Sequence, residues 1–315
     1  MNGALEVQAG ETTVRVSHPG KVLFPDAGIT KAQLADYYLT VADTMLPHLR
    51  ARPVAMERYP DGISGHRIFQ KDVPAYFPDW VDRVTVDKEG GTLTQVVCEN
   101  AATLVYLADL ACITPHAWLS RIDRPGWPDQ LIFDLDPAGD DFVAARSAAL
   151  AVRALLDELD LPSFVKTTGQ RGLHVTVPLD RSADFDAVRS FARDVARELV
   201  ARHPTQLTLE QRKDRRGGRL YLDLMRNGYA QTAVPPYAVR ATSLGTVATP
   251  LHWDELSDLS LRPAWFTLGT VPGRIAATQD PWATMAHHPR NLADAGKRIR
   301  ALGAQRTRQS GDPGA

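Results

Sequence analysis

Apolar residues recur along this chain with two different periods, and these periods predict a mixed α/β architecture. Residues 30–46 carry an apolar stripe that includes Leu34 and Tyr37, and Thr30 and Gln33 have the spacing of a capping box. Similar periodicity predicts three further helices, at residues 101–111, 142–159 and 185–202. Shorter apolar runs predict strands at residues 54–59, 93–98, 131–135, 164–168, 173–178 and 220–224. Such alternation is typical of sheets flanked by helices.

The apolar pattern thins near the C-terminal end of the chain. We therefore predict one large domain over residues 1–275 and a C-terminal extension over residues 276–315 that is basic and partly disordered. Residues 305–315 are polar and rich in Gln, Arg and Gly, a composition typical of disorder. The gradual ending of the chain favours a stand-alone protein over an excised domain.

Composition excludes a membrane-spanning protein. Of the 315 residues, 44% are hydrophobic and 23% are charged. No stretch approaches the roughly 20 apolar residues that cross a bilayer, and the N-terminus lacks the features of a signal peptide. Cys98 and Cys112 both lie in apolar segments and outside any C-x-x-C motif. We therefore expect buried thiols and a cytoplasmic location.

Positive charge is concentrated in two segments, although the formal net charge is only −1. Clusters of this kind are the electrostatic signature of phosphate or nucleic-acid binding, but a solvated face has the same composition. The clustered residues are Arg212, Lys213, Arg215, Arg216 and Arg219, and in the C-terminal tail Lys297, Arg298, Arg300, Arg306 and Arg308.

The strongest chemical signal follows the apolar strand at residues 131–135. Asp134 and Asp136 are two residues apart, so on a strand their carboxylates project from the same face. Neighbouring carboxylates repel one another unless a proton or a cation lies between them, and Mg²⁺ and Mn²⁺ prefer oxygen ligands. The pair therefore predicts a metal site. The alternative is that one Asp caps the next helix and the other faces water.

A third carboxylate, Asp223, ends a similar strand at residues 220–224. If this strand lies beside the strand of Asp134, the three acids can hold two metal ions. Such ions, about 3.5–4 Å apart, stabilise the attacking and leaving oxygens of phosphoryl transfer. If the two strands are not neighbours, Asp223 is an ordinary turn residue.

A polar, glycine-containing loop at residues 166–174 separates these acids. Gly169 and Gly172 let backbone N–H groups approach an anion, and Thr168, Arg171 and His174 add side-chain donors. The loop suits a triphosphate. A plain hairpin turn with incidental polar residues is the alternative.

These three blocks together resemble the three motifs of archaeo-eukaryotic primases. Within that superfamily the chain is similar to the polymerase domain of LigD, the bacterial end-joining ligase, and to its stand-alone relatives, the Prim-PolC-like repair polymerases. The resemblance extends from about His18 to Leu256. It is carried by D-L-D at 134–136, T-G-Q-R-G-L-H at 168–174, Y-L-D at 221–223, K-V-L-F-P at 21–25 and P-Y-A-V-R at 236–240.

The resemblance implies a primase-polymerase-like core of mixed β-sheets flanked by helices. It implies a template-dependent nucleotidyltransferase that adds NTPs or dNTPs to a primer 3′-hydroxyl at DNA gaps or double-strand breaks. The implied cofactors are two Mn²⁺ or Mg²⁺ ions, and the implied DNA carries a 5′-phosphate. A DNA ligase and Ku are the implied protein partners, and the implied location is the bacterial cytoplasm, at the nucleoid.

Individual roles follow from the same resemblance. It assigns Asp134 and Asp136 to both metal ions and Asp223 to the catalytic ion. Lys21, Lys31 and His18 match residues that grip the 5′-phosphate, and Phe69 matches one of two aromatic residues that stack on bases. The implied nucleotide ligands are Thr168, Gly169, Arg171, His174, Arg216, Arg240 and His116, with Thr114 as the alternative alignment for His116.

The chain departs from its relatives at several places. Thr168 and Arg171 of the second motif stand where relatives often have Ser and Lys, which keeps the hydroxyl and the charge. Glu57-Arg58 stands where many of them have Lys-Arg, and Ile68 replaces the second stacking aromatic. It also shows no ligase motif and no nuclease domain.

Two other functions compete with the polymerase interpretation. In phosphatases of the haloacid dehalogenase type, an apolar strand also ends in D-x-D, with the first Asp as nucleophile and the second as acid/base. Pro137 after the motif, and the long segment before it, argue against that class. A catalytically inactive DNA-binding module is the second alternative, and the presence of all three acids argues against it.

Overall fold

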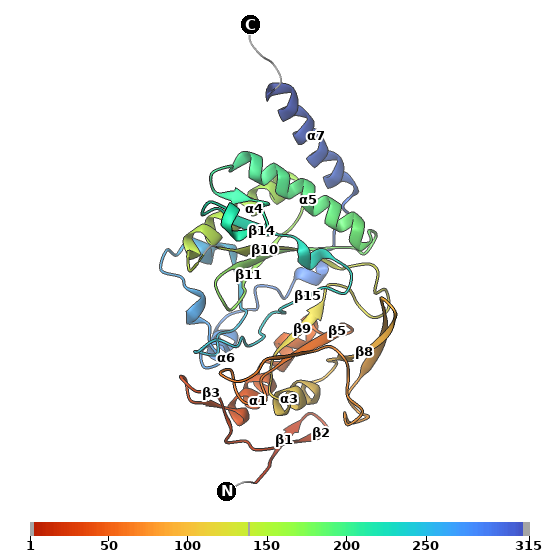
Figure 1. The fold of residues 1–315 in the computed structure, drawn as a ribbon, viewed down its shortest axis with the longest axis vertical. Helices are drawn as coiled ribbons and strands as arrows, with labels where there is room; N and C mark the ends of the chain where they lie inside the picture. The colour runs from red at the N-terminus through yellow and green to blue at the C-terminus, as the bar shows by residue number, and fades with distance from the viewer. Residues whose placement is uncertain (1–2, 138, 311–315) are drawn as a thin grey trace.

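Two β-sheets form the frame of the molecule in the computed structural model, which describes residues 3–137 and 139–310 (Figure 1). The first sheet has the strand order β13 (Leu207–Thr208), β14 (Leu220–Asp223), β10 (Gln130–Asp136), β12 (Leu173–Pro178), β11 (Phe164–Thr167) and β16 (Pro250–Leu251). The second has the order β15 (Thr232–Ala233), β9 (Cys112–Trp118), β5 (Pro53–Arg58), β8 (Gly91–Val97) and β7 (Arg83–Lys88), with β6 (Ile68–Gln70) paired to β5. Two hairpins complete the strands: β1 (Leu5–Ala9) with β2 (Thr12–Val16), and β3 (Val22–Phe24) with β4 (Ile29–Thr30).

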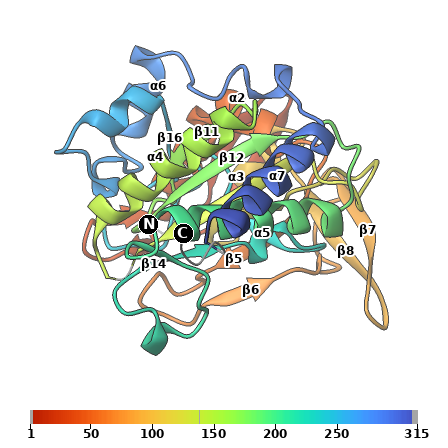
Figure 2. The ribbon, with the colours of Figure 1, turned by 90° about the horizontal axis from the view of Figure 1, so that it is seen from above.

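Helices cover the outer side of each sheet. Seen from above, α4 (Phe142–Glu158) and α5 (Phe185–Arg202) lie over the first sheet, and α7 (Ala293–Ser310) packs on α5 (Figure 2). Beside the second sheet, α1 (Lys31–Thr40) packs against α3 (Ala101–Asp109). The shorter helices are α2 (Ala42–Met45), α6 (Val271–Ala277) and the 3₁₀ turns η1 (Leu46–His48), η2 (Lys213–Arg215), η3 (Met225–Asn227), η4 (Trp253–Ser257), η5 (Pro263–Trp265) and η6 (Met285–His287).

The predicted elements are confirmed, with boundaries that agree to within two residues for the six strands and for the helices at 101–111, 142–159 and 185–202. The capping box of α1 is also confirmed, because the Thr30 side chain accepts from Gln33 N and the Gln33 side chain accepts from Thr30 N. The predicted helix at 30–46 is divided into two. It breaks at Val41, whose φ of −93° and ψ of 1° leave the helical region, and restarts as α2.

Residues 305–310, part of the segment predicted to be disordered, continue α7 to Ser310. Residues 311–315 lie outside the described part of the chain. The helix is held because Ala295 and Ile299 are buried against the main core and Arg306 pairs with Glu198 of α5. In the described part of the chain, no helix is both long and apolar enough to span a bilayer.

Part of the predicted C-terminal extension is packed into the body of the protein. Trp282 is buried, and its indole N–H donates to Val165 O at 3.0 Å. The boundary near residue 275 itself stays a prediction. Cys98 and Cys112 are free and buried, as expected.

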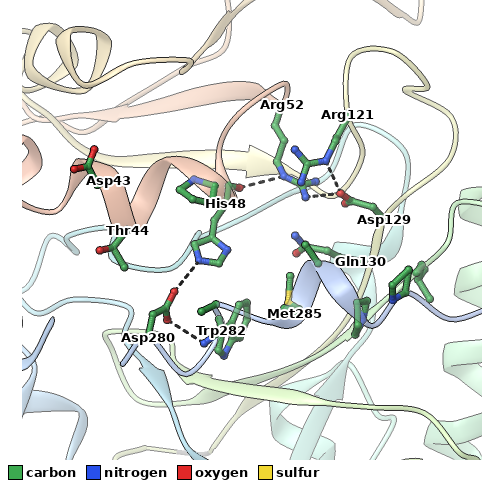
Figure 3. Close-up of a pocket in the computed structure, with 16 residues that line it drawn as sticks. Asp43, Thr44, His48, Arg52, Arg121, Asp129, Gln130, Asp280, Trp282 and Met285 are labelled. Carbon is green, nitrogen blue, oxygen red and sulfur yellow. Dashed lines mark hydrogen bonds and ion pairs between the residues drawn. The ribbon is translucent and has the colours of Figure 1, made fainter. Parts of the chain in front are cut away.

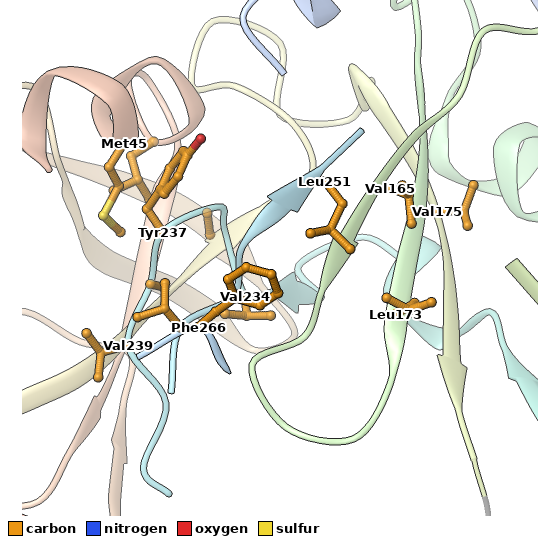
Figure 4. Close-up of a cluster of buried hydrophobic side chains, with 14 of the residues drawn as sticks. Met45, Val165, Leu173, Val175, Val234, Tyr237, Val239, Leu251 and Phe266 are labelled. Atoms are coloured by element: carbon orange, nitrogen blue, oxygen red, sulfur yellow. The ribbon is translucent and has the colours of Figure 1, made fainter. Parts of the chain in front are cut away.

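Strand alternation decides which side chains reach the space between the sheets. On β10, Leu131, Phe133 and Leu135 belong to the main apolar core, whereas Asp134 and Asp136 project from the opposite face. One apolar core joins the two sheets, and Figure 4 shows part of it, with Val165 and Leu173 of the first sheet, Met45 of α2, and Val234, Tyr237 and Val239 of the connecting segment. Each fully buried aliphatic side chain of this kind contributes roughly 1.5–3 kcal/mol.

Candidate active site

Four ionisable residues lie side by side across the first sheet. Lys166 of β11 is directly opposite His174 of β12, which is opposite Asp134 of β10. Asp134 is in turn opposite Asp223 of β14. Residues opposed on neighbouring strands project from the same face, so these four residues form one continuous charged row. The strands of Asp134 and Asp223 are therefore neighbours, as the three-carboxylate hypothesis requires.

Asp134 and His174 of the charged row line a cavity of about 120 Å³ between the two sheets, whereas Lys166 and Asp223 do not. Five residues predicted to bind nucleotide, His116, Thr168, Arg171, His174 and Arg240, line it together with Asp134 and Asp136. The remaining lining residues are Gln170, Arg226 and Val234.

The structure places His116, rather than the alternative Thr114, at this cavity. Thr114 is fully buried, and its hydroxyl donates to Val239 O at 2.6 Å. His116 lines the cavity and is fixed from behind by Glu57, with 2.8 Å between Nε2 and Oε2.

Asp134 is the most buried of the three acids. Its Oδ1 lies 3.3 Å from His174 Nε2, and its Oδ2 lies 3.4 Å from Arg226 Nε. Burial alone would raise the pKa of Asp134, but these neighbours outweigh it and hold the pKa at about 2. Asp134 is therefore ionised at neutral pH. Arg226 was not predicted, because it follows Asp223 in a 3₁₀ turn that carries no sequence motif.

Asp136 is more exposed and less well compensated. Partial burial raises its pKa, the charge of Arg171 opposes this effect, and the charge of Asp134 adds to it. The shortest distance between Asp136 and Arg171 is 3.5 Å, long for an ion pair. The charge of Asp136 thus lies close enough to that of Asp134 for the two to repel, an arrangement that a bound cation would stabilise.

His174 is buried on the same face. Burial, and then the charge of Lys166, lowers its pKa to about 4, so the imidazole is neutral at pH 7. An ionised carboxylate only accepts hydrogen bonds, so the nitrogen that faces Asp134 carries the proton. His174 therefore presents an N–H group to the cavity and leaves Nδ1 unprotonated.

Glycine is required at both of these loop positions, for a different structural reason at each. Gly169 has φ of +70°, a left-handed conformation that most residues avoid. A Cβ at Gly172 would collide with the carbonyl oxygen of Leu135, so the loop can approach β10 only with glycine there. Thr168 closes the turn, since its Oγ1 lies 3.3 Å from both Gln170 N and Gly172 N. The loop is thereby held against the acids.

Glu57, the departure noted in the sequence, connects several residues at the edge of the site. Besides His116, its carboxylate contacts Arg67 Nε at 3.0 Å and the hydroxyl of Tyr59 at 3.2 Å. Burial would raise the pKa of Glu57, but His116 and the neighbouring arginines lower it to about 2. A negative charge at this position thus serves to fix His116 rather than to bind phosphate.

Phe69 is on the same edge and is partly exposed. Its ring lies 5.4 Å from that of His116 and 5.6 Å from the guanidinium carbon of Arg67. Ile68 beside it is also exposed.

The residues predicted to bind a 5′-phosphate lie together at the β3–β4 hairpin. Lys21 N donates to His18 O at 2.9 Å, and Lys31 N donates to Lys21 O at 2.8 Å. Their side chains differ. Lys21 is exposed and 3.2 Å from Asp61, whereas Lys31 is buried and 3.2 Å from Asp109.

Arg216 and Asp223 lie near the cavity without lining it. The Arg216 guanidinium carbon stacks 4.3 Å from the ring of Tyr221, and its charge lowers the pKa of Asp136, after that of Lys213. Asp223 Oδ1 accepts from Met225 N at 2.8 Å. Within residues 3–137 and 139–310, no three His, Cys, Asp or Glu side chains are already grouped as metal ligands.

A larger cavity, of about 550 Å³, lies at the other end of β10 (Figure 3). It is lined by Gln130 and by the ion-paired Arg52, Arg121 and Asp129. A strand rises about 3.3 Å per residue, so Gln130 and Asp136 are about 20 Å apart. The larger cavity is therefore separate from the site of the acids.

A sheet with in-register carboxylates, facing a polar glycine loop, defines a nucleotidyltransferase of the primase-polymerase type. The chain belongs to the family of LigD primase-polymerase domains, whose family model matches residues 30–282. This membership confirms the predicted fold and enzyme class, a metal-dependent nucleotidyltransferase, and sets aside the phosphatase alternative.

Relatives of known name support the assignment. The multifunctional non-homologous end joining protein LigD of Mycolicibacterium smegmatis is 35% identical over 253 residues, which are 79% of this chain and 33% of that protein. The bifunctional LigD of Bacillus subtilis is 33% identical over 273 residues, 86% of this chain and 44% of that protein. The chain thus spans a third to less than half of the length of these relatives.

A solved structure also matches. The polymerase domain from Mycobacterium tuberculosis ligase D, in complex with DNA, has a TM-score of 0.83 and 32% sequence identity. The match covers 88% of this chain and 99% of that domain.

Proposed function

We propose that this protein extends a primer 3′-hydroxyl with a template-matched NTP or dNTP at gaps or broken ends of DNA. The observation that supports this most strongly is the register of the sheet, which sets Asp134 against Asp223 while Asp136 lines the cavity beside the polar loop. The inactive DNA-binding alternative gives no reason for carboxylates to be assembled in this way.

The acids fit two Mn²⁺ or Mg²⁺ ions, because they supply only oxygen donors and because the charge of Asp134 reaches Asp136 and raises its pKa. In this proposal Asp134 and Asp136 hold both ions and Asp223 holds the catalytic one. The ions, when bound, stabilise the attacking and leaving oxygens of the transfer. Side-chain rotation is needed to complete the set, since Asp223 turns toward Met225 N.

The polar loop and its neighbours bind the triphosphate in this proposal. Thr168, Gly169, Arg171 and His174 donate to phosphate oxygens, and Arg240 and Arg216 add positive charge. Arg240 also holds the loop in place, with its Nη1 3.4 Å from Thr168 O. His116, fixed by Glu57, is positioned to contact the sugar.

Two further surfaces contact the DNA. Lys21, Lys31 and His18 bind a 5′-phosphate downstream of the gap, since lysine ammonium groups are good phosphate ligands. Phe69 stacks on a template or nucleotide base, an interaction that contributes about 1–3 kcal/mol.

End joining is the biological setting that we propose, because the named relatives are end-joining proteins. A DNA ligase and Ku are the proposed partners, and the nucleoid is the proposed location.

Extension of gapped DNA tests the proposal. A duplex with a short gap and a downstream 5′-phosphate is incubated with single NTPs or dNTPs and either Mn²⁺ or Mg²⁺. We expect addition of the template-matched nucleotide, which is lost in the Asp134→Asn, Asp136→Asn double variant. DNA binding without extension under either metal would support the inactive DNA-binding module instead.

A further inference from the structure

The larger cavity, at the amino end of β10, has the size of a small-molecule site. Its volume of about 550 Å³ lies within the roughly 300–1,000 Å³ that is typical of ligand pockets. Three parts of the chain enclose it: the α2–η1 segment, the neighbouring ends of β10 and β12, and residues 280–289 (Figure 3). No residue proposed to bind metal, nucleotide or DNA lines this cavity. It is therefore a site without a role in the proposed reaction.

Part of the cavity wall is apolar. Trp282 and Met285 line it and are buried side chains, with exposed fractions of 2% and 7%. Pro47, Pro178 and Leu179 add further apolar surface. An organic ligand with an apolar body would lose water-exposed surface against these side chains, which favours binding.

The two guanidinium groups of the lining are already engaged by the protein. Arg52 Nη2 and Arg121 Nε both donate to Asp129 Oδ2, at 2.7 and 2.8 Å. The remaining N–H groups of Arg52 donate to two backbone carbonyl oxygens, and Arg121 Nη1 donates to a third. Both cations thus compensate protein groups, and an anionic ligand would find little free positive charge.

The carboxylates of the lining, in contrast, keep oxygens that the protein does not use. In the described part of the chain, the Asp43 side chain has no hydrogen-bond or ion-pair partner. Asp280 Oδ1 accepts from the Tyr237 hydroxyl at 2.6 Å, but Oδ2 is 3.7 Å from His48 Nε2, beyond hydrogen-bonding distance. Asp129 Oδ1 is buried without a hydrogen-bond partner among the described residues. Acceptors are therefore in excess at this cavity.

His48 is an independent sign that a ligand is missing. The residue is 7% exposed, and its Nε2 forms no hydrogen bond within residues 3–137 and 139–310. In Figure 3 the imidazole is directed toward the Asp280 carboxylate at the cavity. An unsatisfied buried polar atom is costly, so its position in the lining indicates that a further hydrogen-bonding group belongs there.

The balance of charge decides which ligand fits. With histidine counted as neutral, the lining carries three carboxylates and two guanidinium groups, a formal charge of −1. Burial would raise the pKa of Asp280, but its neighbours His48 and Tyr237 outweigh this effect and lower the pKa, so the carboxylate is ionised at neutral pH. A cationic hydrogen-bond donor is complementary to such a lining, whereas a phosphate is not.

We propose that this cavity binds a small organic cation, an amine or amidine carried on an apolar body. The charged group lies toward Asp43 and Asp280, and the body packs on Trp282 and Met285. The paired Arg52 and Asp129 keep their structural role in the wall. The inference is independent of the proposed function, since the cavity is about 20 Å from the acids and binding is measured without turnover.

Three small molecules of nearly the same shape test the charge argument: benzamidine is cationic, benzamide is neutral and benzoate is anionic. Each is titrated into the intact chain, labelled with ¹³C at the methionine methyl groups, without metal or nucleotide. Met285→Leu assigns the signal at the cavity, and Met225, two residues after Asp223, reports on the acids. We expect benzamidine to shift the Met285 signal with a Kd of about 1 mM or tighter, and benzamide to bind at least about tenfold more weakly. Benzoate should cause no shift, and Met225 should respond to none of the three.

Two substitutions test the acids. Asp43→Asn changes an exposed side chain, so the fold should be unaffected, and should weaken benzamidine binding about two- to fivefold. Asp280→Asn should weaken it more, because the Asp280 side chain is only 16% exposed. Urea unfolding of both variants checks that they remain folded, and the binding of benzamide should change in neither.

A matched pair of substitutions tests the location. Ala286→Phe places a ring at a residue that lines the cavity and should abolish benzamidine binding. Thr284→Phe adds the same ring to an exposed neighbour outside the lining and should leave binding unchanged. Primer extension should be normal in both variants. If Met285 does not respond to benzamidine, responds equally to benzamide or benzoate, or still responds in Ala286→Phe, the proposal is wrong. Natural protein that binds benzamidine but extends no primer would refute the proposed function alone.

Discussion

At the amino end of β10, the carboxylate of Asp129 is 2.7 Å from Arg52 Nη2 and 2.8 Å from Arg121 Nε. Arg52 donates its other N–H groups to the carbonyl oxygens of His48 and Trp118. At the carboxyl end of the same strand, the acids lie 3.3–3.5 Å from their nearest cationic or imidazole groups, and the amine of Lys166 has no partner among the described residues. One strand thus carries tightly paired charge at one end and loosely compensated charge at the other.

The difference separates a structural role from a functional one. Burying a charge is costly unless short contacts and further hydrogen bonds compensate it. Arg52 and Arg121 both make short contacts with Asp129 Oδ2, although Asp129 Oδ1 has no hydrogen-bond partner among the described residues. A catalytic end has to exchange its protein partners for substrate and metal ions, so long, weak contacts there are an advantage. Strongly perturbed pKa values combined with poor pairing are typical of functional sites.

The largest expected effect comes from neutralising the central acid of the charged row. Asp134→Asn should reduce primer extension by at least about 1,000-fold, because the residue is proposed to hold both ions. Its free energy of unfolding should fall by about 2 kcal/mol, because His174 and Arg226 hold the pKa of Asp134 at about 2 and so stabilise its ionised form. Gap filling and urea unfolding of the same preparation measure both effects. Near-normal extension would contradict the assignment of this end as catalytic.

The opposite end should show the opposite profile. Arg52→Met leaves the Asp129 carboxylate buried with one cation fewer and should lower the free energy of unfolding by about 3–5 kcal/mol. The turnover of the remaining folded protein should be close to normal, since Arg52 lies far from the acids. Arg121→Met, which removes the more exposed partner of Asp129, is the matched control and should cost less. If Arg52→Met reduced activity as strongly as it reduces stability, the two ends of β10 would not differ in role.

The sequence predicts more of the fold than of the site. Periodicity alone locates α4, α5 and the strands that carry the acids, because a period of 3.6 or 2 is a local property of the chain. It misses β9, where Pro115 and His116 interrupt the apolar run, and it misses α7, whose stability comes from packing on α5.

The sequence predicts many of the individual residues of the site, but it does not predict how the strands bring them together. Asp134, Asp136 and the loop residues are visible as motifs. The charged row is not, because it depends on the register of four strands far apart in the chain. Arg226 and the paired Arg52 and Asp129 are unpredictable for the same reason, since each becomes meaningful only through its partner.

Acid should weaken the paired end of β10. Burial would raise the pKa of Asp129, but Arg52 and Arg121 outweigh it, so the pKa is lowered in the folded state. The stability that this pair contributes is therefore present above the unfolded pKa, about 3.9, and is lost as pH falls through the lower folded value. Urea unfolding between pH 5 and pH 3 should show this loss in the natural protein and less of it in Asp129→Asn. An identical pH dependence in the two proteins would refute this account.

The smallest effects test the comparison at a third place, the β3–β4 hairpin. Lys31 forms a buried pair with Asp109 and resembles the structural end, whereas Lys21 forms an exposed pair with Asp61 and resembles the functional end. Lys21→Met should reduce the preference for a 5′-phosphate over a 5′-hydroxyl by about two- to fivefold, the size of an exposed ionic contact, without a change in unfolding. Lys31→Met should lower stability as well, because it leaves Asp109 largely buried and without its lysine. Lys21→Met could instead destabilise the protein and leave the preference for a 5′-phosphate intact. In that case, the length and exposure of an ion pair would not distinguish structural from functional charges in this molecule.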